Sequence, residues 1–298
     1  MKPKVNIAGD IVIERSRVLD YLTLMKPELT LLSVATAMAG FYLATEGQIN
    51  YLLMLNVFLG TALVGGGAGA LNQYIERGYD AMMRRTENRP LPSGRLAPSE
   101  VLVFGILCSI AGLVVLTALV NPLTGFLAAV TSVSYLFLYT PLKRITSLST
   151  VVGGIPGALP PMMGWTAVRN EISTEAWILF AILFLWQMPH FLSLAWMYKK
   201  DYERAGFPML TVLDTNGEST SRQILLYCVA LIPATVLPTL VGLTGIVYLI
   251  GGAILGIAFA VCGIFLYRNR TNVWARRVFF ASLLYLPILF VIMGLDKL

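Results

Sequence analysis

The chain has 298 residues, of which 57% are hydrophobic and only 13% are charged, whereas an ordinary globular protein has about 45–50% and about 25%. The mean hydropathy of +0.74 agrees with this imbalance. A surface so poor in charge excludes a soluble enzyme, a disordered chain and a nucleic-acid-binding domain. The net charge of +6 is modest, and the positions of the charges are more informative than their sum. We therefore expect an all-α integral membrane protein.

Neither the cysteines nor the N-terminal residues change this expectation. Cys108, Cys228 and Cys262 lie in apolar runs without ligand spacing, so we expect buried thiols and neither a disulfide nor a cysteine metal site. The first 27 residues mix acids with bases and lack an apolar signal core and cleavage site. We expect a cytoplasmic N-terminal segment, residues 1–27, and one transmembrane domain, residues 28–298. The lack of a transit peptide favours the cytoplasmic (inner) membrane of a bacterium.

Apolar segments of membrane-spanning length follow one another along the chain. A hydrocarbon core of about 30 Å requires about 20 apolar residues in a helix. Basic residues concentrate on the cytoplasmic side of membrane proteins, and 20 of the 22 fall in the N-terminal segment and in the loops after the second, fourth, sixth and eighth segments. The pattern predicts an N-terminus in the cytoplasm, a C-terminus outside, and nine transmembrane helices at about residues 28–45, 52–75, 101–120, 123–140, 149–168, 176–198, 224–243, 245–267 and 277–295.

The fifth of these segments has an unusual composition. Residues 151–165 contain three prolines and four glycines within an apolar run. Irregular backbone at membrane depth is tolerated where it is buried in protein or lines a cavity. The segment therefore either forms the wall of an internal chamber or allows close packing of small residues between helices.

Polar residues gather where the second segment leaves the membrane. Asn72, Glu76 and Asp80 recur every four residues, so a helix that continues past the membrane places all three on one face. Mg²⁺ is usually held by one or two carboxylates plus substrate phosphate oxygens. The arginines that follow, Arg85 and Arg89 among them, can bind phosphate in bidentate fashion. The pattern indicates a metal–diphosphate site, with a structural network of ion pairs as the alternative.

Two further helix ends meet the same predicted face. Tyr139 and Lys143 stand four apart at the end of the fourth segment, where the lysine either contacts phosphate or extends to the interface. His190, the only histidine, lies inside the sixth segment, where an ionisable side chain indicates a functional site. It could ligate haem iron, exchange a proton or hydrogen-bond across helices. Asp201 follows His190 by 11 residues, close to three helical turns, so we expect both on one face.

These helix ends together favour a substrate with a diphosphate head and a hydrocarbon tail. Ionisation of an allylic diphosphate needs stabilisation of the leaving group, which a metal and arginines supply electrostatically. The carbocation that remains needs a dry cavity. We therefore expect a central cavity that opens near the cytoplasmic face of the bundle.

Several stretches resemble a known superfamily, the nine-helix intramembrane prenyltransferases of the UbiA type. Residues 72–95 look like its first Asp-rich motif and the loop after it, and residues 139–143, YTPLK, are similar to its Tyr-x-x-x-Lys signature. Residues 153–165, GGIPGALPPMMGW, and residues 189–210, PHFLSLAWMYKKDYERAGFPML, resemble the branch that farnesylates haem. The similarity covers essentially the whole chain.

The chain also departs from the superfamily pattern. Gln73 and Glu76 stand where the first motif has its first two acids, and Gln73 cannot supply charge to a metal. Tyr198 and Tyr202 stand at the two acids of the second motif, which leaves Asp201 as the only nearby carboxylate. These departures favour one Mg²⁺ over two.

The resemblance implies transfer of a farnesyl group from farnesyl diphosphate to the ring A vinyl group of haem B, with addition of water, giving haem O and diphosphate. It implies that Asn72, Glu76 and Asp80 hold Mg²⁺ and diphosphate, with Asp201 assisting from the opposite helix. It also implies that Arg85, Arg89 and Lys143 bind diphosphate, with pairing of one of the two arginines to a haem propionate as the alternative. Tyr139 would stabilise the cation or the leaving group, and His190 would contact haem. Haem A synthase or a terminal oxidase is the implied downstream partner.

Other functions remain open from the residues alone. A prenyltransferase of the same fold could act on an aromatic quinone precursor or a chlorophyll-type acceptor. A transporter should have internal repeats with paired broken helices, and only one segment here is clearly interrupted. A non-catalytic assembly factor for a haem–copper oxidase would not need the row of polar residues beside several arginines.

Overall fold

The computed structural model describes residues 4–5, 11–12 and 16–298. Two short strands, β1 (Lys4–Val5) and β2 (Ile11–Val12), pair in antiparallel fashion. The predicted N-terminal segment, residues 1–27, thus lies partly outside the described residues. Its described helix is α1 (Arg17–Leu24), whose last side chain is fully buried.

In the part of the chain that the structure describes, eight helices are long and apolar enough to cross a membrane. They agree with eight of the predicted segments to within a few residues, so the all-α membrane fold is confirmed. Nine spans and the orientation of the termini stay predictions. The eight are α2 (Pro27–Ala44), α3 (Tyr51–Asp80), α4 with the π-helical turn η1 (Pro98–Val120), α5 with the π-helical turn η2 and α6 (Pro122–Leu142), α8 (Thr174–Met197), α11 (Glu218–Leu240), α12 (Ile246–Asn269) and α13 (Asn272–Leu295).

The fifth predicted segment forms α7 (Ser149–Arg169), an uninterrupted helix in spite of its three prolines. It packs against α2 so closely that the two backbones touch. A Cβ atom added to Gly164 would lie 1.8 Å from the carbonyl oxygen of Ala37, and one added to Gly40 would lie 2.0 Å from that of Pro161. On this side of α7, the small residues therefore serve close packing between helices.

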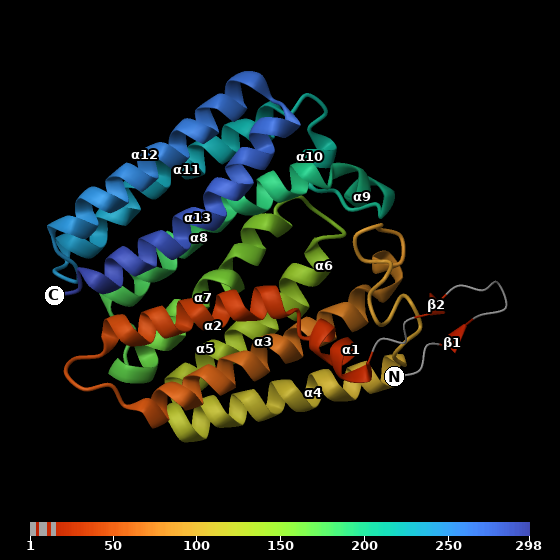
Figure 1. Cartoon of the computed structure of the whole chain (residues 1–298), viewed down its shortest axis with the longest axis horizontal. Helices are drawn as coiled ribbons and strands as arrows, with labels where there is room; N and C mark the ends of the chain where they lie inside the picture. Colours follow the sequence, from red (N-terminus) through yellow and green to blue (C-terminus); the bar gives the residue numbers. More distant parts are fainter. Residues whose placement is uncertain (1–3, 6–10, 13–15) are drawn as a thin grey trace.

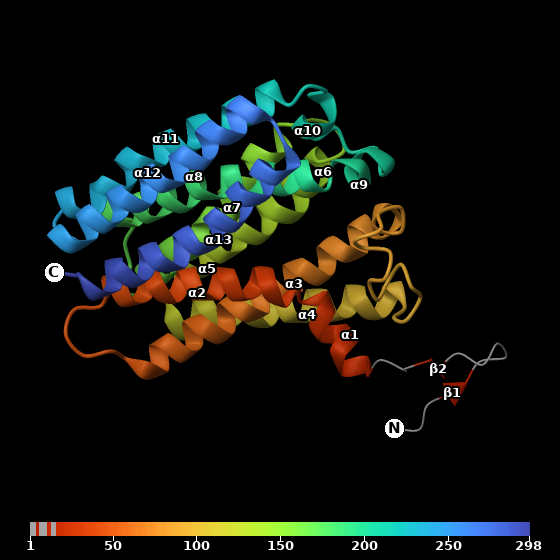
Figure 2. The same ribbon diagram turned by 45° about the horizontal axis from the view of Figure 1, so that its top comes forward.

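The helices form one bundle with α7 and α8 at its centre (Figures 1 and 2). α7 packs against α2, α5 and α8, and α8 packs in turn against α11 and α13. A continuous cluster of buried apolar side chains runs through these helices. Large apolar side chains also cover the outside, such as Leu52, 70% exposed, and Ile254, 62% exposed, which is the surface that lipid tails would contact.

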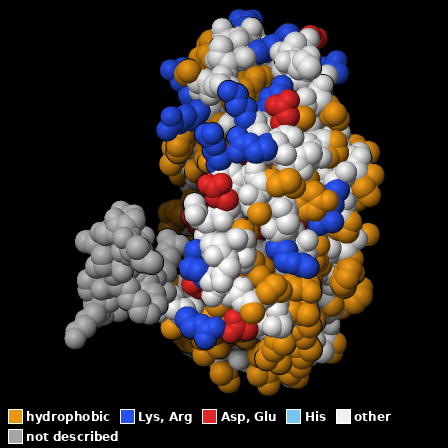
Figure 3. Space-filling model, turned by 90° about the vertical axis from the view of Figure 1, so that its right-hand side faces the viewer, with side chains coloured by type: hydrophobic (Ala, Val, Ile, Leu, Met, Phe, Trp, Pro, Cys, Tyr) orange, Lys and Arg blue, Asp and Glu red, His pale blue; other side chains and the backbone are white. Residues whose placement is uncertain are grey.

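The two ends of the bundle differ in charge. α1, the segment that follows α3, α6 (Thr140–Leu142), α9 (Lys199–Arg204) and α10 (Leu210–Leu213) lie at one end, and the C-terminus lies at the other (Figure 1). Lysines and arginines gather on the first end (Figure 3). A hollow of about 300 Å³ at the opposite end is lined by Arg169 and Lys297, the two basic residues predicted outside. The helix ends that carry predicted site residues, those of α3, α6 and α9, lie together at the first end of the bundle, as predicted.

Candidate active site

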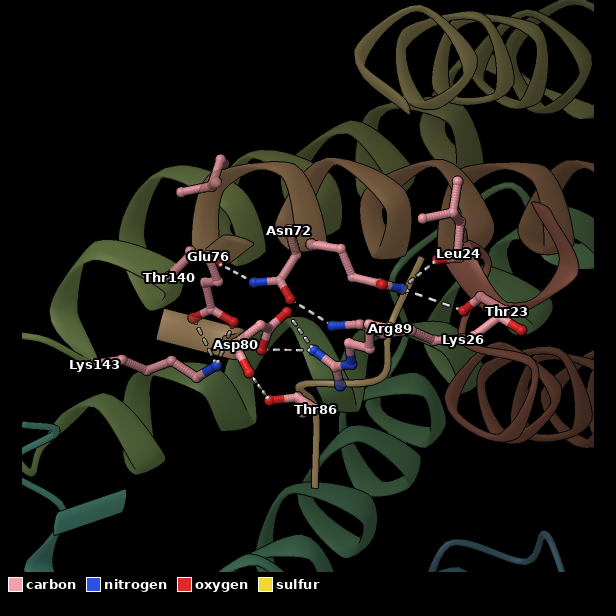
Figure 4. A network of polar contacts seen from close by, with 12 residues as sticks. Thr23, Leu24, Lys26, Asn72, Glu76, Asp80, Thr86, Arg89, Thr140 and Lys143 are labelled. Carbon is pink, nitrogen blue, oxygen red and sulfur yellow. Dashed lines mark hydrogen bonds and ion pairs between the residues drawn. The ribbon is translucent and has the colours of Figure 1, made fainter. Parts of the chain in front are cut away.

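Three polar residues of α3, those predicted to share one face, form a buried row. Asn72, Glu76 and Asp80 are 0, 3 and 1% exposed. They lie along one side of the last turns of α3, which extends beyond the predicted residue 75, and their side chains point toward a common set of basic groups (Figure 4). The predicted placement on one face is confirmed.

Glu76 is paired with the lysine of the fourth predicted segment. Lys143 follows α6 directly, and its Nζ donates to both carboxylate oxygens of Glu76, at 2.8 and 3.1 Å. Burial disfavours the charged form of this lysine, but the Glu76 carboxylate outweighs burial and raises the pKa of Lys143 above its usual value. The Nζ also lies 4.9 Å from the ring centre of Tyr139. Lys143 thus points into the site and not along the helix to the membrane interface.

Asp80 is paired with an arginine of the loop after α3. Nη1 of Arg89 donates to both Asp80 carboxylate oxygens, at 2.9 and 2.7 Å. The hydroxyl of Thr86 donates to the Asp80 carbonyl oxygen at 2.8 Å, which fixes the first turn of the loop. The chain therefore folds back after α3 and returns a cation to the end of the row.

A third cation, Lys26, also reaches the row on α3. The sequence pattern identifies it only as one of the basic residues that set the topology. Its Nζ donates to Oδ1 of Asn72 and, at 3.3 Å, to the hydroxyl of Tyr135. Burial, and then the positive charge of Arg89, lower the pKa of Lys26 to about 7. Its φ of 49° is uncommon for a residue with a side chain. The available signal was a lysine directly before the proline that begins α2.

Arg85, in the loop that follows α3, lies against two aromatic rings. Its guanidinium carbon lies 5.2 Å from the ring centre of Tyr198 and 6.0 Å from that of Tyr202. Asp201, on the same helix as Tyr202, has its Oδ1 3.8 Å from Nη1 of Arg204. The arginine and the two tyrosines thus bring α9 to the loop that follows α3.

The expectation that His190 and Asp201 share one helix face is wrong. α8 ends at Met197 and α9 begins at Lys199, so the helix is interrupted at Tyr198 and the spacing along one axis no longer applies. His190 lies in α8, and its Nδ1 is 2.8 Å from the hydroxyl oxygen of Ser282 in α13.

The His190 ring is also held by neighbouring aromatic rings. It stacks on Trp186 and Phe279, with ring centres 5.1 and 4.9 Å apart. The contact with Ser282 is a hydrogen bond across helices, which is one of the three roles that the sequence allowed for His190. Contact with haem stays a prediction.

The row on α3 has the donor set for one Mg²⁺. Two carboxylates and one amide oxygen, from Glu76, Asp80 and Asn72, leave coordination positions for water and diphosphate oxygens, as this ion prefers. In the described part of the chain, no three His, Cys, Asp or Glu side chains gather as a metal site. Binding of one ion by these three side chains together with diphosphate stays a prediction. Participation of Asp201 stays a prediction.

Residues 33–284 match the model of the UbiA prenyltransferase family. The chain belongs to this family. A UbiA-type relative, the protoheme IX farnesyltransferase of Solibacter usitatus, is 47% identical over 287 residues, which cover 93% of this chain and 98% of the relative. The protoheme IX farnesyltransferase of Myxococcus xanthus is 46% identical and covers 93% of this chain and 94% of its own.

The UbiA fold is also shared with a solved structure. A UbiA homologue from Archaeoglobus fulgidus bound to DMAPP and Mg²⁺ superposes with a TM-score of 0.67 at 15% identity, covering 92% of this chain and 99% of the homologue. At this identity the likeness concerns the fold alone. Family membership and the apolar helices make this chain a multi-pass membrane prenyltransferase.

Proposed function

We propose that the chain transfers a farnesyl group from farnesyl diphosphate to the ring A vinyl group of haem B, giving haem O and diphosphate. Relatives that share 40–48% of their residues with this chain carry the name protoheme IX farnesyltransferase, which supports both substrates. The same relatives are bacterial, which supports the cytoplasmic membrane of a bacterium. Haem A synthase or a terminal oxidase would receive the product.

The observation that carries the donor half of this proposal is the buried row on α3 with its cations. Lys143 and Arg89 are tied to Glu76 and Asp80, and Lys26 to Asn72. A diphosphate entering here would exchange lysine–carboxylate and arginine–carboxylate contacts for contacts with phosphate oxygens. When the carbon–oxygen bond of the donor breaks, its electron pair passes to the diphosphate, and these cations stabilise the charge that develops.

A magnesium ion bound by Asn72, Glu76 and Asp80, with Asp201 as a further candidate ligand, would supply Lewis-acid stabilisation of the leaving diphosphate. The protein side chains themselves orient the donor. Lys143 and Arg89 define where the diphosphate lies, and the apolar bundle beside them excludes water from the hydrocarbon chain.

The acceptor half requires a carbon nucleophile next to the farnesyl C1 atom. The terminal vinyl carbon of haem forms the new carbon–carbon bond, which leaves a cation on the vinyl carbon attached to the ring. Water adds to this cation and loses a proton, giving a hydroxyethylfarnesyl group. Tyr139, whose ring lies beside Lys143, is our candidate for stabilising the allylic cation or the leaving group. His190 and its stacked neighbours are the candidate haem contact.

The test compares acceptors on purified protein in lipid nanodiscs. Farnesyl diphosphate and Mg²⁺ are supplied with haem B or with 4-hydroxybenzoate, and products are separated by chromatography and mass spectrometry. We expect farnesylated, hydrated haem and no prenylated benzoate. Prenylation of the benzoate in place of haem would contradict the acceptor, and release of no diphosphate with either acceptor would contradict the donor.

A further inference from the structure

Arg85 differs from Arg89 and Lys143, the two ion-paired cations of the site, in what holds it. Arg89 and Lys143 each donate to a carboxylate, those of Asp80 and Glu76. Among the residues that the structure describes, Arg85 forms no such ion pair, and its side chain is exposed. No acid among residues 16–298 therefore neutralises its positive charge.

Two tyrosine rings support Arg85 in place of a carboxylate. Its guanidinium carbon lies over Tyr198 at 5.2 Å and over Tyr202 at 6.0 Å. The two tyrosines are four residues apart, and the amide of Tyr202 donates to the carbonyl of Tyr198 at 3.2 Å, so their side chains leave neighbouring turns on one side. Phe207 packs edge-on against Tyr202 and lies 5.9 Å from Nζ of Lys143. The Tyr202 ring is thereby held in a fixed position relative to the buried row on α3.

An aromatic face holds a cation without using its donors. Attraction to the ring quadrupole leaves the five N–H groups of a guanidinium available. An anion that binds Arg89 or Lys143 must first displace a carboxylate, whereas an anion that binds Arg85 displaces none of the carboxylates that the structure describes. Tyr202 also packs against Phe207, whose ring centre lies 5.9 Å from Nζ of Lys143, so Arg85 is joined to the same site through these rings.

We propose that Tyr198 and Tyr202 are positioning residues that hold Arg85 as the first cation to engage the diphosphate of the prenyl donor. The inference rests on the proposed function, because it assumes that this donor binds here. Arg85 captures the diphosphate, and the pairs at Glu76 and Asp80 then open to phosphate oxygens. Loss of the tyrosine faces should raise the KM for the donor and leave kcat largely unchanged, since the chemical step uses the buried cations.

The proposal is tested by calorimetric binding of farnesyl thiodiphosphate, whose carbon–sulfur bond is not cleaved, to the full chain with Mg²⁺. The double variant Tyr198→Phe/Tyr202→Phe keeps both ring faces, and we expect binding within about twofold of wild type. Tyr198→Leu/Tyr202→Leu removes the faces, and we expect binding about 5- to 30-fold weaker, the effect of two exposed cation–π contacts. The thermal unfolding midpoint of each variant checks that the fold is retained, and Tyr198→Leu alone replaces the double variant if it does not fold.

A double-mutant cycle separates positioning from general damage. Arg85→Gln should weaken binding by at least as much as the leucine pair, and the leucine pair on the Arg85→Gln background should add almost nothing. A matched control is Arg77→Gln, because Arg77 also lies over a tyrosine, 4.6 Å from the Tyr74 ring centre, but on the exposed side of α3. That variant should bind like wild type.

Three results would overturn the proposal. One is unchanged binding by the leucine pair, and another is a full further loss when the leucine pair is added to Arg85→Gln. A loss with the phenylalanine pair equal to that with the leucine pair would assign the effect to the hydroxyls and not to the ring faces. If wild-type protein does not bind the analogue at all, the proposed donor site itself is wrong, which distinguishes that failure from the others.

Discussion

Replacement of Asp80 by asparagine should lower kcat strongly while it lowers the stability of the fold only modestly. Asp80 is 1% exposed, and both of its oxygens accept from Arg89, whose side chain keeps 22% of its surface exposed. Asn keeps the shape but removes the negative charge. Loss of one preorganised electrostatic group costs about 10²–10³ in kcat, or about 3–4 kcal/mol in the activation barrier. Unpairing Arg89 should cost about 1–3 kcal/mol of stability, less than for a wholly buried pair, because water reaches the arginine.

The assay is the initial rate of haem farnesylation in nanodiscs, with Mg²⁺ and farnesyl diphosphate each titrated. We expect kcat for Asp80→Asn to fall at least 100-fold and not to recover at high Mg²⁺. The matched control is Glu100→Gln, which removes the charge from an exposed ion pair with Arg17 at the same end of the bundle and should leave kcat unchanged. A kcat for Asp80→Asn within twofold of wild type, in folded protein, would refute the reasoning.

Further outcomes follow from other parts of the structure. Lys143→Gln should raise the KM for farnesyl diphosphate about 10- to 100-fold in steady-state assays, and an unchanged KM would speak against its role. The pKa of Lys26 lies at about 7, so the lysine loses its proton as pH rises from about 6 to about 8. Binding of farnesyl thiodiphosphate, measured by calorimetry, should therefore weaken by up to about tenfold over this range. Lys26→Arg should make binding nearly independent of pH. Gly164→Ala should lower thermal stability by about 1–3 kcal/mol through contact with the α2 backbone, whereas Gly78→Ala, where a Cβ meets nothing within 4 Å, should be neutral or slightly stabilising. His190→Phe keeps ring stacking but loses the contact with Ser282, so it should raise the KM for haem alone; an equal change in both KM values would contradict a specific haem role.

The fold was predictable from the sequence because the membrane restricts the choices. Backbone groups in lipid must be satisfied within a helix, so apolar segments of sufficient length predict helices directly. The interior of α7 was less predictable, since three prolines and four glycines fit either a cavity wall or close packing. Only the approach of Gly164 to the α2 backbone distinguishes these on that side of the helix.

The relative positions of site residues were predictable where one continuous helix carries them, and less so where a helix is interrupted between them. Asn72, Glu76 and Asp80 needed only a continuous helix, which α3 provides. The relation of His190 to Asp201 depended on the same assumption and was wrong, because the helix is interrupted at Tyr198.

The position of Lys26 beside Asn72 could not be predicted from the spacing of residues along the sequence. Lys26 is 46 residues away from Asn72 in the chain and reaches it through packing of the start of α2 beside α3. The position of the lysine directly before the proline that begins α2 is visible in the sequence, but it does not indicate a partner in a distant segment. Its unusual φ of 49° becomes visible only in the folded chain.

The central claim is the identity of the product, and it is tested most directly in cells that lack their own haem-farnesylating enzyme. Haem is extracted with and without expression of this chain and analysed by chromatography and mass spectrometry, and presence of the protein in the membrane is verified separately. We predict a new haem, heavier than haem B by one farnesyl group and one hydroxyl group, and its absence with Asp80→Asn. Haem B alone, in membranes that contain the wild-type chain, would contradict the proposed reaction.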